Sequence, residues 1–274
     1  MMRIWTTIAV LAACLTVAKA DSAKTLCTII ADSDGRVLLE QGPACRERVT
    51  PASTFKVPLA VMGFDAGILT GPNAPVWPFR KGYPDWGGAR WRQPTEPIAW
   101  MHNSVVWYSQ RITERLGEQR LSDYATSFGY GNADFSGDLG KNNGLERAWI
   151  GSSLKISPRE QAVFIARLAG LRLPNREASR HAIELLEVHK SAGWAIRGKT
   201  GSAFPRLANG ELDRAHGWGW YVGWAEKAGS RLVIVRLRQD TERQKQSGGL
   251  RTRATILGDW ARLVADPGVA ATLK

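Results

Sequence analysis

The stretch TPASTFKVPLAVMGF, residues 50–64, places a serine three residues before a lysine and follows both with apolar side chains. From Ser53 onward the pattern is helical, and on a helix this spacing puts the hydroxyl of Ser53 and the amine of Lys56 on one face. An unpaired ammonium is costly to bury, so Lys56 must be paired, reach solvent or be kept uncharged for chemistry. The rest of the sequence has to decide between these three states.

Proline at position 58 restricts where this helix can begin. Pro58 lacks a backbone N–H and frees the carbonyl of Thr54, which is tolerable only near a helix start. Ser53 would then stand at the positive end of the helix, where N–H groups favour developing negative charge. A second Ser-x-x-Lys, Ser152 to Lys155, precedes a capping box in what reads as a solvated turn; about one such motif is expected by chance in a chain of this size.

The hydrophobic pattern changes from strand to helix and back along the chain. It predicts a hairpin over 25–41 and strands over 193–204, 216–226 and 231–239. It also predicts helices from Ser53 onward, over 104–116 with Asn103 as cap and Gly117 as stop, over 158–169 after a Ser157 capping box, and over 250–264.

Strands at both ends of the chain with helices between them favour an α/β fold of the α+β type. We expect one largely antiparallel sheet built from both chain ends, flanked by terminal helices, with a helical lobe inserted over roughly residues 67–191. The mature chain, residues 21–274, would be a single catalytic domain. A site is expected in the cleft between the lobes.

The first 20 residues have a basic start, a short apolar run and a small-x-small ending at Ala20, the pattern of a secretory signal. An alternative is lipoprotein processing at LAAC, which would leave a lipid on Cys14. Export predicts a periplasmic, oxidising location in which Cys27 and Cys45 remain as an even pair. They would form a disulfide or stay as two buried thiols.

Composition argues against several classes of function. The 274 residues carry a formal net charge of +12, but the basic residues are scattered and no nucleic-acid-binding signature accompanies them. After the leader no segment is long and apolar enough to span a membrane. Metal-ligand spacing is absent from the four histidines, His102, His181, His189 and His216, so metal catalysis has no support.

Two further motifs are weak alone and informative together. A Lys-Thr-Gly triplet at Lys199 falls at the end of a predicted strand, and Ser104 begins a predicted helix. Alone, the first is an ordinary strand terminus and the second an auxiliary cap. With Ser53 and Lys56 they supply a nucleophile, its base, a second hydroxyl and a second cation on elements that converge on one cleft. This set indicates acyl transfer.

At this point the sequence resembles a class D β-lactamase, an oxacillinase of the serine penicillin-recognising superfamily. Ser-x-x-Lys followed by Lys-Thr-Gly is an established signature of relatives in that superfamily. The motifs stand in family order and cover nearly all of the mature chain: PASTFK at Pro51, SVVWYSQ at Ser104, YGN at Tyr130, AWIGSSLKIS around Trp149, KTG at Lys199, GWYVGW at Gly219 and LR at Leu250.

The resemblance implies a role for each matching residue. Ser53 would be the nucleophile, and its backbone N–H with that of Ser202 would form the oxyanion hole. Lys56 would be carboxylated on its side-chain nitrogen by CO2 or bicarbonate, with no other cofactor. The remaining roles are support of the carbamate by Trp149 and Val106, proton relay by Ser104, and binding of the substrate carboxylate by Lys199, Thr200, Gly201 and Arg251. Tyr130 would be structural.

Two segments depart from the family pattern and leave the substrate preference among β-lactams open. After KTG the chain reads Ser202-Ala203-Phe204-Pro205, where an aromatic or small residue followed closely by glycine is expected, and residues 78–100 match only in their tryptophans. The resemblance implies a small-molecule β-lactam as the partner; the oligomeric state is not predicted.

Two rival functions share Ser53, Lys56 and KTG. A cell-wall peptidase would keep an uncarboxylated lysine and place an asparagine two residues after the second serine, where this chain has Val106. A β-lactam sensor domain would stay acylated, but known sensors of that type are anchored in the membrane by several spans. Both are less favoured than a β-lactamase.

Overall fold

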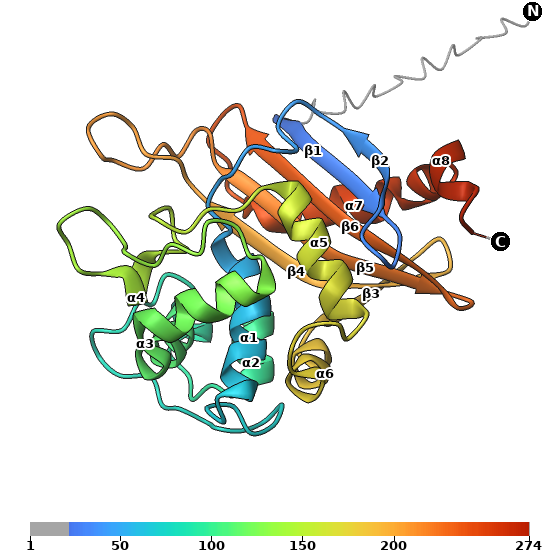
Figure 1. Cartoon of the computed structure of the whole chain (residues 1–274). Helices are drawn as coiled ribbons and strands as arrows, with labels where there is room; N and C mark the ends of the chain where they lie inside the picture. Colours follow the sequence, from blue (N-terminus) through green and yellow to red (C-terminus); the bar gives the residue numbers. More distant parts are fainter. Residues whose placement is uncertain (1–21, 274) are drawn as a thin grey trace, which may run out of the picture.

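The computed structural model describes residues 22–273, so the proposed signal segment and Cys14 lie outside the described part of the chain. Its centre is a six-stranded sheet in the order β2-β1-β6-β5-β4-β3. Every neighbouring pair is antiparallel. The strands are β1 (Ala23–Ala31), β2 (Val37–Gln41), β3 (Glu187–Ser191), β4 (Trp194–Ala203), β5 (Trp218–Lys227) and β6 (Ser230–Asp240). The sheet therefore unites both ends of the chain, as predicted (Figure 1).

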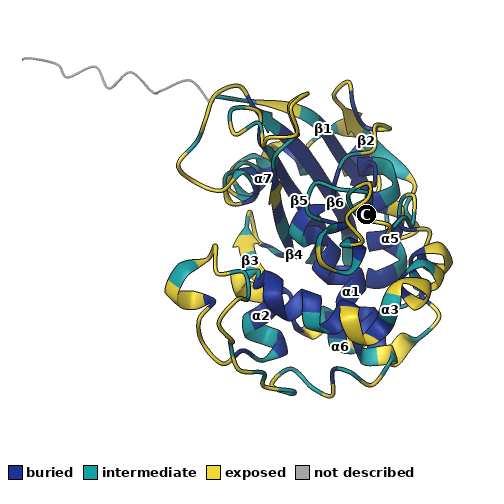
Figure 2. Ribbon diagram, turned by 90° about the vertical axis from the view of Figure 1, so that its left-hand side faces the viewer, coloured by how far each residue is buried: buried dark blue, intermediate teal, exposed yellow. Residues whose placement is uncertain are grey.

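Both faces of the sheet are covered by helices. Neighbouring residues of a strand point to opposite faces, so Val233 and Val235 of β6 enter one apolar core while Leu232 and Ile234 enter the other. Helix α5 (Pro158–Ala169) packs on the first face, and α7 (Gly248–Val264) packs on the second (Figure 2). A short C-terminal helix, α8 (Pro267–Ala270), contacts β2.

The remaining helices gather on the side of the sheet that β4 and β3 form (Figure 1). They are the 3₁₀ turn η1 (Ala52–Phe55), α1 (Lys56–Asp65), η2 (Gly88–Arg90), α2 (Pro97–Asn103), α3 (Val106–Phe128), α4 (Gly144–Arg147) and α6 (Arg176–Glu184). Helix α1 is buried over most of its length because α3 and α6 pack against it. A helix that is apolar all round belongs in the interior, which explains the apolar run after Lys56.

Local sequence signals account for many of the boundaries. The Ser157 hydroxyl accepts from the backbone N–H of Glu160, and the Glu160 carboxylate accepts from the backbone N–H of Ser157, which confirms the predicted capping box. Helix α5 starts with Pro158 and stops before Gly170. The predicted N-terminal hairpin, the three C-terminal strands and the last long helix are also present.

The helix predicted over residues 104–116 was wrong at both ends. Asn103 is the last residue of α2 and caps nothing, and Ser104 adopts a left-handed conformation with φ 56° before α3 begins at Val106. Gly117 breaks the helical path with φ 76° and ψ 164°, yet a further helical segment continues to Phe128. The left-handed step at Ser104 matters for the site, because it turns this serine out of both helices.

The boundary predicted for the helical lobe also needs correction. Strand β3 and helix α5 fall within residues 67–191 but belong to the sheet layer, β3 by pairing with β4 and α5 by packing on β1, β5 and β6. Strand β3 was not predicted, because its sequence EVHKS alternates without a strongly apolar face. The inserted lobe therefore consists of α2, α3, α4, α6 and their connections beside α1.

Cys27 of β1 and Cys45 form a disulfide, with Cα atoms 5.0 Å apart. This confirms the bonded alternative over two buried thiols. Within residues 22–273, no helix combines the length and apolar character needed to cross a membrane.

Candidate active site

A tight turn brings Ser53 and Lys56 to the junction of the sheet and the helical lobe. Ala52 takes a left-handed conformation, φ 51°, at a cost of about 1 kcal/mol for a residue with a side chain. The backbone N–H and the hydroxyl of Thr54 both donate to the carbonyl of Pro51, the latter at 2.7 Å. Ser53 remains partly exposed, while Lys56, one turn later, is fully buried.

Strand β4 lies close against this turn, and helix α7 lies close against β4. A Cβ added to Gly201 of β4 would lie 2.9 Å from the carbonyl oxygen of Pro51, and one added to Gly249 of α7 would lie 2.7 Å from the carbonyl oxygen of Gly201. Side chains at these positions would push β4 away from Ser53. The glycine of the KTG triplet is therefore required by packing.

The amine of Lys56 is fully buried among helical residues. Its Nζ donates to the hydroxyl of Ser109 at 2.8 Å, and the same oxygen accepts from the indole N–H of Trp100 at 2.9 Å. Burial, with a smaller contribution from the charge of Lys199, holds the pKa of Lys56 well below its ordinary value. Of the states open to Lys56, the geometry favours the uncharged one.

Ser109 and Trp100 were not identified from the sequence. Ser109 lies three residues after Val106 on α3, so the two share one face of that helix, and this spacing was a usable signal. Trp100 is on α2, and its contact to Ser109 depends on how the two helices meet. Trp100 orients the Ser109 hydroxyl through its hydrogen bond, and Ser109 in turn positions the Lys56 amine.

Ser104, which lines the cleft, and the buried Lys199 form a second pair of polar groups. The Lys199 Nζ of β4 donates to the Ser104 hydroxyl at 2.6 Å and lies 3.5 Å from the Thr200 hydroxyl. Burial lowers the pKa of Lys199 to about 8, with Glu187 opposing the shift and Arg253 adding to it. Lys199 can therefore exchange a proton with Ser104 near neutral pH.

Trp149 and Val106 close the buried side of the site. Trp149 stacks on Phe55 with ring centres 5.3 Å apart, and its carbonyl accepts from the Thr50 hydroxyl at 2.8 Å. Both Trp149 and Val106 line the cleft. The stack and the hydrogen bond fix the indole beside the Ser53 turn, although they join residues almost a hundred positions apart in the chain.

Ser202 follows the KTG triplet on β4. Its hydroxyl lies 2.7 Å from that of Ser247 and accepts from the backbone N–H of Gly249 at 2.8 Å. Ser53 and Ser202 line the same cleft, which has a volume of about 790 Å³. The cleft is large enough for a drug-sized molecule.

Comparison with known proteins identifies the family to which this chain belongs. The sequence matches the penicillin-binding protein transpeptidase domain over residues 27–260. It is 44% identical to the β-lactamase OXA-9 of Klebsiella pneumoniae over 241 residues, 86% of this chain and 88% of that protein. It is 38% identical to OXA-1 of Escherichia coli over 194 residues, 70% of this chain and 67% of OXA-1. The chain belongs to the class D β-lactamases.

A solved structure agrees with this assignment. The crystal structure of the class D β-lactamase OXA-427 superimposes with a TM-score of 0.81 and 42% identity, covering 88% of this chain and 98% of the other. Class D β-lactamases are hydrolases, so the chain is an enzyme.

Arg251 of this class D β-lactamase was predicted to bind substrate, yet among the described residues it does not line the cleft. Its Nη2 contacts both carboxylate oxygens of Asp240 at 2.5 and 2.6 Å, and its Nε donates to the carbonyl of Gln246 at 3.2 Å. Neighbouring Leu250 and Arg253 line the cleft instead. Sequence reasoning missed Asp240, which also lines it.

The segments that depart from the family pattern form the outer wall of the cleft. Phe204, which follows KTG, lines it together with Trp86 from the tryptophan-rich loop. Trp86 is 62% exposed, so an apolar group of a ligand could cover it. His102 also lines the cleft. Within the described residues, no group of three or more His, Cys, Asp or Glu side chains could hold a metal ion.

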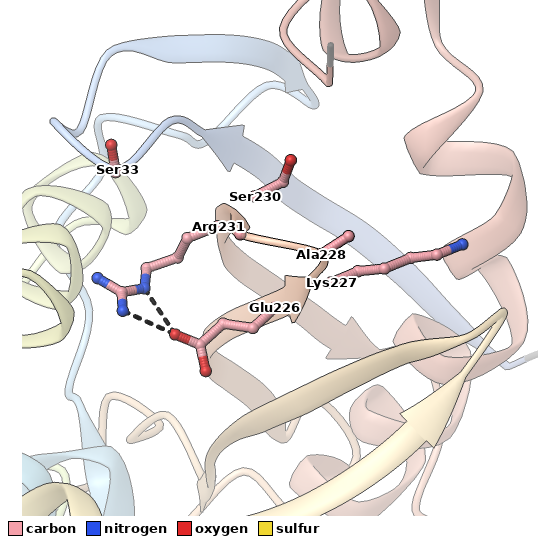
Figure 3. Close-up of a pocket in the computed structure, with 7 residues that line it drawn as sticks. Ser33, Glu226, Lys227, Ala228, Ser230 and Arg231 are labelled. Atoms are coloured by element: carbon pink, nitrogen blue, oxygen red, sulfur yellow. Dashed lines mark hydrogen bonds and ion pairs between the residues drawn. The ribbon is translucent and has the colours of Figure 1, made fainter.

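A second hollow, of about 540 Å³, lies at the β5–β6 turn (Figure 3). Its main feature is an ion pair in which Arg231 Nε donates to Glu226 at 2.8 Å. It holds Ser33 and Ser230, but Lys227 points away from both (Figure 3). Within residues 22–273, no side chain is hydrogen-bonded to the hydroxyl of Ser33 or Ser230.

Proposed function

We propose that this β-lactamase hydrolyses the ring of penicillin-type antibiotics through an acyl-enzyme on Ser53 and so confers resistance to them. The observation that carries the mechanism is the buried Lys56 amine, whose pKa is held well below its ordinary value. A neutral amine keeps its lone pair, whereas an exposed ammonium does not. Lys56 is thus able to add CO2, losing one proton and becoming a carbamate.

The residues around Lys56 suit that adduct. The hydroxyl of Ser109 already meets its Nζ, and Trp149 presents an indole in the same wall. Indole and hydroxyl are both hydrogen-bond donors, which a carbamate oxygen needs when it is buried. When formed, the carbamate supplies a general base that takes the Ser53 proton and later activates water.

The other groups act on the substrate. The Ser53 oxygen attacks the lactam carbonyl, and the backbone N–H groups of Ser53 and Ser202 stabilise the oxyanion. The C–N bond breaks as Ser104 passes a proton to the lactam nitrogen, and Lys199, 2.6 Å away, restores the proton of Ser104. Water then cleaves the ester and frees Ser53. Thr200 and Gly201 lie where the substrate carboxylate would bind, with Arg251 available once it leaves Asp240.

Deacylation separates this function from its rivals, since peptidases and sensors also acylate their serine. Purified protein should turn over many equivalents of a chromogenic cephalosporin. Trp149→Ala should loosen the carbamate and slow deacylation more than acylation, giving a burst of about one equivalent and an acyl adduct visible by mass spectrometry. A native protein that stops after one equivalent would instead be a sensor or penicillin-binding protein.

We also propose export to the periplasm, with cleavage after Ala20 as the first route and lipidation at Cys14 as the second. The Cys27–Cys45 disulfide supports an oxidising compartment. No cofactor is proposed for the enzyme beyond CO2 or bicarbonate at Lys56.

A further inference from the structure

Arg251, which is expected to bind the anionic substrate, forms an ion pair with Asp240. The negative charge of Asp240 should repel the same substrate. Asp240 ends β6 and lines the cleft, while Arg251 lies in the first turns of α7. The side chains are 8% and 16% exposed, so the pair is partly shielded from water. A shielded pair is screened less by salt than a surface pair, and it is harder to open.

The substrate carboxylate and Asp240 carry the same chemical group. A guanidinium has five planar N–H donors, and it binds a carboxylate most strongly through two neighbouring nitrogens. Here the contacts to Asp240 at 2.5 and 2.6 Å occupy Nη2, and the carbonyl of Gln246 takes Nε. An incoming carboxylate therefore has to displace Asp240 to bond to two nitrogens of Arg251, or bind through Nη1 alone.

We propose that Asp240 is a specificity-determining residue that competes with the substrate carboxylate for Arg251. The proposal rests on the β-lactam-hydrolysing function above. Asp240 makes ground-state binding of anionic β-lactams weaker than the site would otherwise allow, and it leaves the reaction at Ser53 untouched. Its effect falls on KM, because the carboxylate contact is equally strong in the ground and transition states.

The first test compares a penicillin with its methyl ester, which has no carboxylate. Asp240→Asn keeps the shape of the side chain and removes its charge. It should lower KM for the penicillin by about tenfold and change kcat and the KM of the ester by less than about twofold. Glu242→Gln is the matched control, because it removes one exposed charge two residues away; it should leave all these constants unchanged.

A second variant shows whether the gain passes through Arg251. In Asp240→Asn/Arg251→Ala the KM for the penicillin should return to within about threefold of the native value. The proposal is overturned if Asp240→Asn leaves or raises KM, if the ester gains as much as the acid, or if the gain survives without Arg251. Absence of any β-lactam hydrolysis by the native protein would reject the proposed function instead.

One measurement does not depend on the folding of an Asp240 variant. A crystal structure of the Trp149→Ala acyl-enzyme with a penicillin should show the Arg251 guanidinium on the substrate carboxylate and Asp240 released. A guanidinium still paired with Asp240 in that acyl-enzyme would overturn the proposal.

Discussion

The two Ser-x-x-Lys segments of this chain have the same residue types at the same spacing and different surroundings. Lys56 lies on α1 with no exposed surface, and its Nζ meets Ser109. Lys155 lies in the connection between α4 and α5 with its side chain in solvent. Its backbone is what matters there, since its N–H donates to Asn132 Oδ1 and its carbonyl accepts from the Asn132 N–H.

The serines of the two segments differ in the same way. Among the residues described, the Ser53 hydroxyl makes no hydrogen bond to another side chain or to backbone, and it faces the cleft. The Ser152 hydroxyl donates to Asp138 Oδ1 at 2.7 Å. One serine is free to react and the other is held by a carboxylate. Desolvation of the lysine and freedom of the serine, and not the motif, therefore distinguish a site from a turn.

The largest difference between the segments should appear when each lysine is removed. Lys56→Ala should lower kcat/KM by about 10⁴-fold, because the base of both half-reactions is lost. Lys155→Ala should change it by less than about twofold, because the backbone contacts to Asn132 remain. Steady-state hydrolysis of a chromogenic cephalosporin measures both. Comparable losses in the two variants would contradict the comparison.

Carboxylation should separate the two lysines at low pH. An ordinary lysine is almost fully protonated at pH 7, whereas the lowered pKa of Lys56 keeps its amine neutral to more acidic pH. As pH falls through that pKa, the amine gains its proton and the carbamate is lost. Activity in CO2-free buffer should therefore fall progressively as the buffer is acidified and return when bicarbonate is added.

The same experiment has two matched controls. Lys155→Ala should keep the bicarbonate response, and ¹³C-bicarbonate should give a carbamate resonance in Lys155→Ala but not in Lys56→Ala. If neither CO2 removal nor added bicarbonate changes the activity, Lys56 acts as a free amine, as in the peptidase alternative.

The sequence predicts those residues whose role follows from the spacing and type of their near neighbours in the chain. Ser53 and Lys56 follow from spacing and an apolar helix, and the sheet follows from alternating runs at both chain ends. Ser109 meets Lys56 across 53 positions. Asp240 forms an ion pair with Arg251 because the end of β6 and the start of α7 lie close together. Such contacts depend on how elements pack, and no periodicity within one element specifies them.

The error at Ser104 has a similar cause. Asn103 followed by an apolar-periodic run looks like a helix cap, but the chain ends α2 there and passes through a left-handed residue. Local preference favours one continuous helix. Packing against Lys199, whose Nζ reaches the Ser104 hydroxyl, favours the break. A tertiary contact therefore accompanies the departure from the cap signal at this position.

The smallest expected effect concerns stability and compares the two serines. Ser152→Ala should lower the free energy of unfolding by about 1 kcal/mol, because a partly buried Asp138 oxygen loses its shorter hydrogen bond and keeps only Arg206 Nη2 at 3.4 Å. Ser53→Ala removes no such bond within the described structure, so its unfolding free energy should stay within about 0.5 kcal/mol of the native value. Activity should show the reverse order, with Ser53→Ala inactive and Ser152→Ala near native. Urea unfolding and hydrolysis assays on the same two preparations provide the measurement. A larger loss of stability in Ser53→Ala than in Ser152→Ala would mean that Ser53 is held by the fold, and the contrast between a free and a bound serine would not stand.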